Sequence, residues 1–123
     1  MIWSGLVGRF LRRRAPRDSS AVDQDVVRQL RGLGADLSRP RHVRHFLYFQ
    51  EEGFARRAAE QVEKANYDAT VTAPSDDVPV WTVRAEGFRV IGEETVPGFR
   101  AWFEHIAAGY NGEYDGWEPA TKP

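Results

Sequence analysis

The stretch RHVRHFLYF, residues 41–49, decides how the rest of this chain is interpreted. Its side chains alternate between two faces, with Val43, His45, Leu47 and Phe49 on one and His42, Arg44, Phe46 and Tyr48 on the other. Alternation with period two and an aromatic ending predict a β-strand rather than a helix. Because one face of this strand is largely apolar, the flanking sequence must supply a layer that covers it.

Apolar residues at helical spacing predict three helices on the two sides of this strand. The predicted ranges are Ala21–Leu33, Glu52–Ala65 and Val96–Tyr110. We expect Ser20 to cap the first helix, Asp23 to lie near its positive end, and Gly34 to end it.

Alternating segments predict three further strands, Tyr67–Ala73, Val78–Ala85 and Glu113–Trp117. Residues 86–92 fit either an extension of the third strand or a loop. The order is therefore a helix followed by β-α-β-β-α-β, which is two split βαβ units in succession. This order predicts the α+β class, as a ferredoxin-like α/β sandwich. Its four-stranded antiparallel sheet would carry helices on one face, with an extra N-terminal helix.

The charged residues are distributed unevenly, although 17 basic and 18 acidic residues give a net charge of only −1. Residues 1–17 carry five arginines and no acidic residue, whereas residues 76–123 carry nine acidic and four basic residues. Nucleic-acid binding needs a basic face, which the acidic body does not offer. We therefore expect a protein partner of basic character and no direct binding of nucleic acid.

Residues 1–17 form a basic amphipathic segment ahead of a single domain, residues 18–123. The apolar residues Ile2, Trp3, Leu6, Val7, Phe10 and Leu11 recur at helical spacing, opposite Arg9, Arg12 and Arg13. The run is too short to span a bilayer, and its arginines follow the apolar stretch, unlike those of a secretory signal. The pattern is typical of contact with a membrane surface or a partner, and a frayed terminus is the alternative.

The residue types that usually carry catalysis or bind metals are few and poorly spaced. With zero cysteines, thiolate catalysis, iron–sulfur clusters and Cys-based zinc sites are excluded. His42 and His45 fall on opposite faces of the predicted strand, and His105 is distant in sequence. Nucleophile-elbow, phosphate-loop and dinucleotide motifs are absent from the sequence. We expect no catalytic residue, no metal site, no cofactor and no enzymatic activity.

The most unusual stretch is GEYDGWE, residues 112–118, which combines two aromatic residues, three acids and two glycines. Strand alternation predicts that Tyr114 and Asp115 point to opposite faces. Two interpretations stay open. The stretch is part of a partner surface, or Trp117 closes the core while Asp115 holds the turn.

At these residues the sequence resembles the family of regulators of ribonuclease E activity B (RraB). Glu113-Tyr114-Asp115-Gly116-Trp117-Glu118 is similar to the closing motif of that family. The strand of residues 45–49 followed by an alanine-rich helix, and the valine-rich strand around Trp81, also look like it. The resemblance covers about residues 20–118. Enterobacterial members carry a long acidic tail after the motif, whereas residues 119–123 of this sequence contain one charged side chain, Lys122.

The resemblance implies a ferredoxin-like sandwich that binds the endoribonuclease RNase E and inhibits RNA cleavage without catalysis of its own. It implies partner-binding residues in the closing motif, since arginine-rich segments of RNase E would suit an acidic binder. A cytoplasmic location follows, with a peripheral position at the inner membrane if residues 1–14 bind lipid. The alternative hypotheses are a membrane-surface adaptor with no role in RNA decay, and a small hydrolase without a known motif.

Overall fold

The structure is a computed structural model that describes residues 19–119. Within that range the helices are α2 (Ser19–Gly32), α3 (Glu52–Lys64) and α4 (Val96–Gly109). The strands are β1 (Arg41–Phe49), β2 (Asp68–Thr72), β3 (Trp81–Arg89) and β4 (Glu113–Pro119). They form one sheet in the order β2-β3-β1-β4, in which each neighbouring pair is antiparallel.

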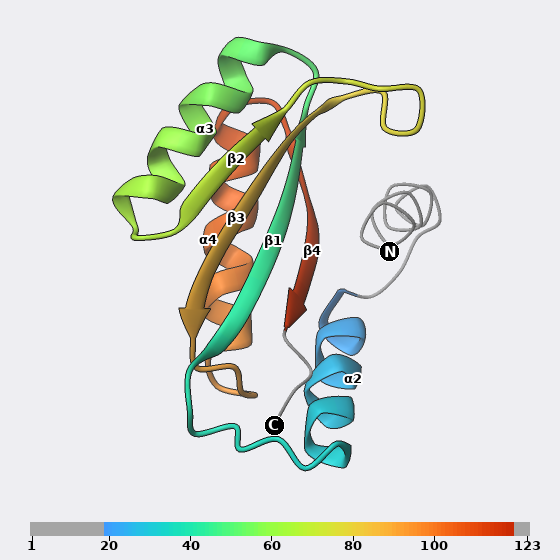
Figure 1. Cartoon of the computed structure of the whole chain (residues 1–123), viewed down its shortest axis with the longest axis vertical. Helices are drawn as coiled ribbons and strands as arrows, with labels where there is room; N and C mark the ends of the chain where they lie inside the picture. The colour runs from blue at the N-terminus through green and yellow to red at the C-terminus, as the bar shows by residue number, and fades with distance from the viewer. Residues whose placement is uncertain (1–18, 120–123) are drawn as a thin grey trace.

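This topology confirms the predicted ferredoxin-like sandwich. The first two strands of the chain, β1 and β2, are separated by β3, as two split βαβ units require. Helices α3 and α4 cover the same face of the sheet, with α3 against β2 and β3 and α4 against β4 and β1 (Figure 1). We call the opposite face of the sheet the open face.

The alternation predicted for β1 divides its side chains between the two faces. Val43, Leu47 and Phe49 are buried beneath the helices, together with Phe103 of α4 and Val62 of α3. Burying large apolar side chains of this kind stabilises the fold by about 1.5–3 kcal/mol each. The larger of the two buried apolar clusters in the described chain thus lies between the sheet and these helices.

The third strand differs from its predicted range of Val78–Ala85. It begins at Trp81 and continues to Arg89, so residues 86–89 extend the strand. Pro79 has no N–H to donate to a strand ladder, and Val78 is instead held in a turn through hydrogen bonds with Ser75. The valines at 78 and 80 cross to the open face, where both are buried with two residues of β1, Phe46 and Tyr48.

The predicted start of the first helix is also wrong. Helix α2 begins at Ser19, so Ser20 lies inside it rather than at its cap. Gly34 ends this helix region with a φ of 80°, as expected. The first turns of α2 lie beside the carboxyl end of β4 (Figure 1), where Asp23 has partners in β4 and α4.

The contacts predicted for Ile2, Trp3 and the rest of the amphipathic segment fall outside the described residues. Between residues 19 and 119, no helix combines the length and apolar character needed to cross a bilayer.

Candidate functional site

The closing motif forms β4, an edge strand whose only neighbour in the described sheet is β1. Two aromatic residues of the motif, Tyr114 and Trp117, point beneath the helices and are nearly buried. Two inward residues three apart require a break in strand alternation. The register with β1 shifts between Phe46 and Leu47, leaving Asp115 as the extra residue of a β-bulge.

Glycine is required at two positions of this segment. Gly116 has a φ of 141°, a conformation that residues with a Cβ rarely adopt. A Cβ on Gly112 would lie 2.4 Å from the Phe49 ring and 2.5 Å from the carbonyl oxygen of Tyr48. Gly112 and Gly116 therefore allow β4 to bend and to approach β1 closely.

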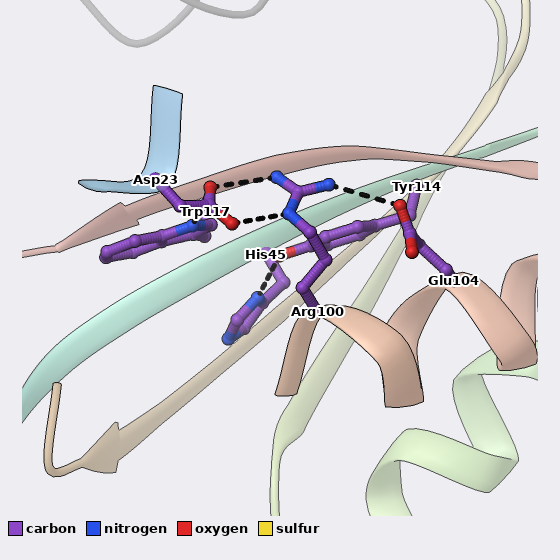
Figure 2. Close-up of polar contacts among 6 residues, drawn as sticks. All are labelled: Asp23, His45, Arg100, Glu104, Tyr114 and Trp117. Atoms are coloured by element: carbon purple, nitrogen blue, oxygen red, sulfur yellow. Dashed lines mark hydrogen bonds and ion pairs between the residues drawn. The ribbon is translucent and has the colours of Figure 1, made fainter. Parts of the chain in front are cut away.

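The inward face of β4 is joined to two helices through one carboxylate. Figure 2 shows Asp23 of α2 between Trp117 and Arg100 of α4. The Trp117 indole Nε1 donates to Asp23 Oδ1 at 2.8 Å, and Arg100 Nη2 donates to the same oxygen at 3.0 Å. The second carboxylate oxygen accepts from Arg100 Nε at 2.5 Å. This bidentate pair fixes the arginine plane and fastens α2 to the sandwich.

The electrostatics of Arg100 follow from its position. Burial disfavours the charged guanidinium, but the hydrogen bonds and charge of Asp23 outweigh burial and raise the pKa of Arg100 above its ordinary value. The charges of Tyr114 and Glu104 act in the same direction. Arg100 also lies 5.0 Å from the centre of the Tyr114 ring, a cation–π distance. Arg100 is therefore a permanently charged structural link.

A histidine lies at the centre of the aromatic core. His45 is fully buried, and its Nδ1 is 2.8 Å from the hydroxyl of Tyr114 (Figure 2). Its ring stacks on Phe103 with centroids 3.9 Å apart and meets Phe99 edge-on. These contacts give His45 a structural role. His42 lies on the open face beside Glu86, so the prediction that His42 and His45 point to opposite faces is confirmed.

The outward side of the motif carries carboxylates on the open face. Asp115 Oδ2 accepts a hydrogen bond of 3.0 Å from the Tyr48 hydroxyl, and Glu118 pairs with Arg44 at 3.4 Å. Glu113 is exposed at the start of the strand. The expectation that Tyr114 and Asp115 lie on opposite faces is confirmed, and one partner of Asp115 is a tyrosine of β1.

The same face continues across the sheet with charges of both signs. Glu86 of β3 forms an ion pair with Arg84, at 3.0 Å from Nε, and lies 3.2 Å from His42 Nε2. Phe88, at the far end of β3, is 66% exposed. Acidic side chains dominate at the β4 edge of this face, whereas the centre is mixed.

A groove of about 550 Å³ lies between α2 and α4. It is lined by charges of both signs, among them Arg28, Glu93 and Glu104. In the part of the chain that the structure describes, no three His, Asp or Glu side chains are placed to share a metal ion.

Sequence reasoning found the closing motif but missed its partners, Asp23 and Arg100. In sequence, Asp23 fits a helix-terminal charge, and no local pattern assigns a role to Arg100. One signal was available: Arg100 shares the apolar helix face of Val96, Phe103 and Ala107. A charged residue on a buried helix face needs an opposite charge nearby.

Comparison with known proteins identifies a family. The family model for regulator of ribonuclease activity B (RraB) matches residues 20–118. That range runs from the first turn of α2 to the end of the closing motif. No curated protein matches the chain. Since the match covers most of the sequence, the chain belongs to the RraB family, the regulators of ribonuclease activity B.

Proposed function

We propose that this protein is a non-enzymatic regulator that binds an RNase E-type endoribonuclease directly and lowers its cleavage of RNA. The observation that carries the proposal is the family match over residues 20–118. The family is described as a regulator of ribonuclease activity. We place the protein in the cytoplasm, with residues 18–123 as the interacting domain and residues 1–17 as a separate segment.

The surface proposed for the partner is the outward side of the closing motif, residues 113–118. Glu113, Asp115 and Glu118 present carboxylates there, while Tyr114, Gly116 and Trp117 set the shape of the strand beneath them. A row of carboxylates along an edge strand suits an arginine-rich segment, because arginine donates paired hydrogen bonds to carboxylates. Charge at the rim of an interface mainly speeds association.

The test uses purified full-length protein and a purified RNase E-type enzyme that retains its arginine-rich segment. We expect the protein to bind the enzyme and to slow cleavage of a fluorescent RNA. The variant Glu113→Lys/Glu118→Lys should weaken binding about tenfold and flatten its salt dependence.

The matched control is Glu60→Lys/Glu63→Lys, which makes the same charge change on the exposed face of α3. It should change affinity by less than about twofold, because α3 lies on the other side of the sheet. Equal losses in both variants would place the partner elsewhere. Wild-type protein that neither binds the enzyme nor alters RNA cleavage would contradict the proposed function itself.

A further inference from the structure

The open face of the sheet holds an apolar cluster at its centre and carboxylates at the β4 edge. Phe46 and Tyr48 are only 2% and 3% exposed, although α3 and α4 lie on the other face. Val78 and Val80 are the buried apolar residues that join them within residues 19–119. Thr82 of β3 is also buried beside Tyr48, and charged side chains of β1, β3 and β4 surround the cluster. The cluster is therefore an apolar centre on a face that is otherwise largely charged.

The carboxylates beside this cluster come from neighbouring strands. Glu113 is exposed, and Asp115 and Glu118 are partly exposed, along β4. Glu86 lies two strands away in β3, opposite Arg44. A ligand that matched this face would need apolar side chains for the centre and several cations for the edge.

Residues 1–17 have this pattern. Six apolar residues recur at helical spacing from Ile2 to Leu11, and five arginines accompany them without any acidic residue. The segment therefore offers an apolar row next to a basic row, the complement of the open face.

The connection also permits the contact. The described chain begins at Ser19, and four residues later Asp23 is hydrogen bonded to Trp117 of β4. Seventeen residues span about 25 Å as a helix, and the seven residues of β4 span about 23 Å. Asp23 lies at the inward side of β4, and β4 is the edge strand of the described sheet. The path from α2 to the open face therefore crosses the edge of β4 only.

We infer that residues 1–17 dock on the open face of their own sheet, with apolar side chains over Phe46 and Tyr48 and arginines near the β4 carboxylates. The segment then occupies the surface proposed for the ribonuclease and acts as an internal competitor. The docking is inferred only from the residues of the open face and the sequence of residues 1–17, whereas the competition also rests on the proposed function. A short tether gives the segment an effective concentration in the millimolar range, so an external basic ligand must displace it.

The docking test uses the full chain with one spin label. The sequence has no cysteine, so Gly8→Cys supplies a unique attachment point. We expect the label to broaden the amide signals of Phe46, Tyr48 and residues 113–118 and to leave those of α3 sharp. Adding Arg12→Glu/Arg13→Glu/Arg14→Glu should restore the sharp signals. The matched control is Arg56→Glu/Arg57→Glu/Lys64→Glu, the same charge change on α3, which should leave the broadening in place.

Three results would overturn the docking. The first is no broadening on the open face. The second is equal broadening when spin-labelled chain is mixed with an unlabelled, isotope-enriched chain, which would make a second copy the occupant. The third is a label that becomes immobile only when anionic phosphatidylserine vesicles are added, which would make a membrane surface the occupant.

The competition is measured separately with a synthetic deca-arginine peptide. The chain carrying Arg12→Glu/Arg13→Glu/Arg14→Glu should bind it about threefold or more tightly than the wild-type chain, and the α3 control should not. Unchanged peptide affinity would overturn the competition. Docking without any binding of the ribonuclease would contradict only the proposed function, and ribonuclease binding without docking would contradict only this inference.

Discussion

The indole Nε1 of Trp117 donates a 2.8 Å hydrogen bond to the carboxylate of Asp23, across 94 positions of sequence. The contact joins the last strand to the first described helix. Asp23 and Trp117 lie near the two ends of the family match, residues 20–118. The same carboxylate neutralises Arg100 of α4. One acidic side chain therefore holds together three elements that the backbone ladder does not connect.

Replacing Asp23 with alanine should lower the free energy of unfolding by about 3 kcal/mol, because the largely buried Arg100 loses its bidentate partner and keeps the ion pair with the exposed Glu104. Urea unfolding followed by tryptophan fluorescence measures this loss. Asp25→Ala is the control on the same helix. Asp25 pairs with Arg28 in solvent, and its replacement should cost less than about 0.5 kcal/mol. Similar losses for the two variants would show that Asp23 contributes no more than a surface charge.

Two glycine-to-alanine variants should change stability very differently. Gly112→Ala would place a methyl group 2.4 Å from the Phe49 ring, so the β4 turn must move, at a cost of about 2 kcal/mol or more. Gly53→Ala, in α3, meets nothing within 4 Å and should be neutral or stabilising by up to about 1 kcal/mol. Thermal unfolding of both variants compares them directly. A Gly112→Ala chain as stable as wild type would mean that the turn adjusts freely.

The local pattern of the sequence predicts most of this fold. The alternation of residues 41–49 identifies β1 and separates His42 from His45, because strand geometry depends on neighbouring residues only. Asn66 and Gly34 adopt positive φ where the helices end, as their residue types suggest. The error at Val78 has a local cause as well, since Pro79 interrupts the ladder but not the alternation of apolar residues.

The candidate site could be predicted only in part. The closing motif is visible because its residue types are unusual, and alternation correctly separates Tyr114 from Asp115. The bonds of Asp23 to Arg100 and Trp117 bridge 77 and 94 positions, and no local pattern encodes a pairing at such distances. In sequence, Arg100 and Glu104 have the i,i+4 spacing of an ordinary exposed ion pair. This spacing gives no indication that the Arg100 side chain is largely buried.

Stability should fall in alkaline solution through Tyr67. Burial raises the pKa of this phenol above 10.0, and the opposing charge of Arg89 over its ring does not cancel the effect. The unfolded chain therefore loses the proton at lower pH than the folded chain, so the contribution is complete below about pH 10 and is lost as pH rises. Tyr67→Phe should make the alkaline fall in melting temperature shallower.

Melting temperatures between about pH 8 and pH 11.5 test this expectation, with ultraviolet absorbance following phenolate formation. Tyr110→Phe is the matched variant, because Tyr110 is only partly buried. Identical alkaline profiles for wild type and Tyr67→Phe would show that other groups control the transition.

The hydrogen bond between Tyr48 and Asp115 separates the two interpretations of the closing motif. Tyr48→Phe, Asp115→Ala and the double variant form a cycle around one partly buried contact of 3.0 Å. We expect a coupling of about 1 kcal/mol and a fall of several degrees in melting temperature for each single variant. The Glu113→Gln variant, at an exposed position of the same strand, should leave the melting temperature unchanged.

Affinity for the ribonuclease is then measured on the same variants. If Asp115 serves only the architecture of β4, its variants lose affinity in proportion to the unfolded fraction. Glu113→Gln measures how much affinity is lost when one negative charge is removed from an exposed position of the same strand. If the Asp115 carboxylate contacts the partner, Asp115→Ala weakens binding more than Tyr48→Phe at equal stability. That difference is the signature of an interface, because the two variants break the same internal bond while only one removes a negative charge.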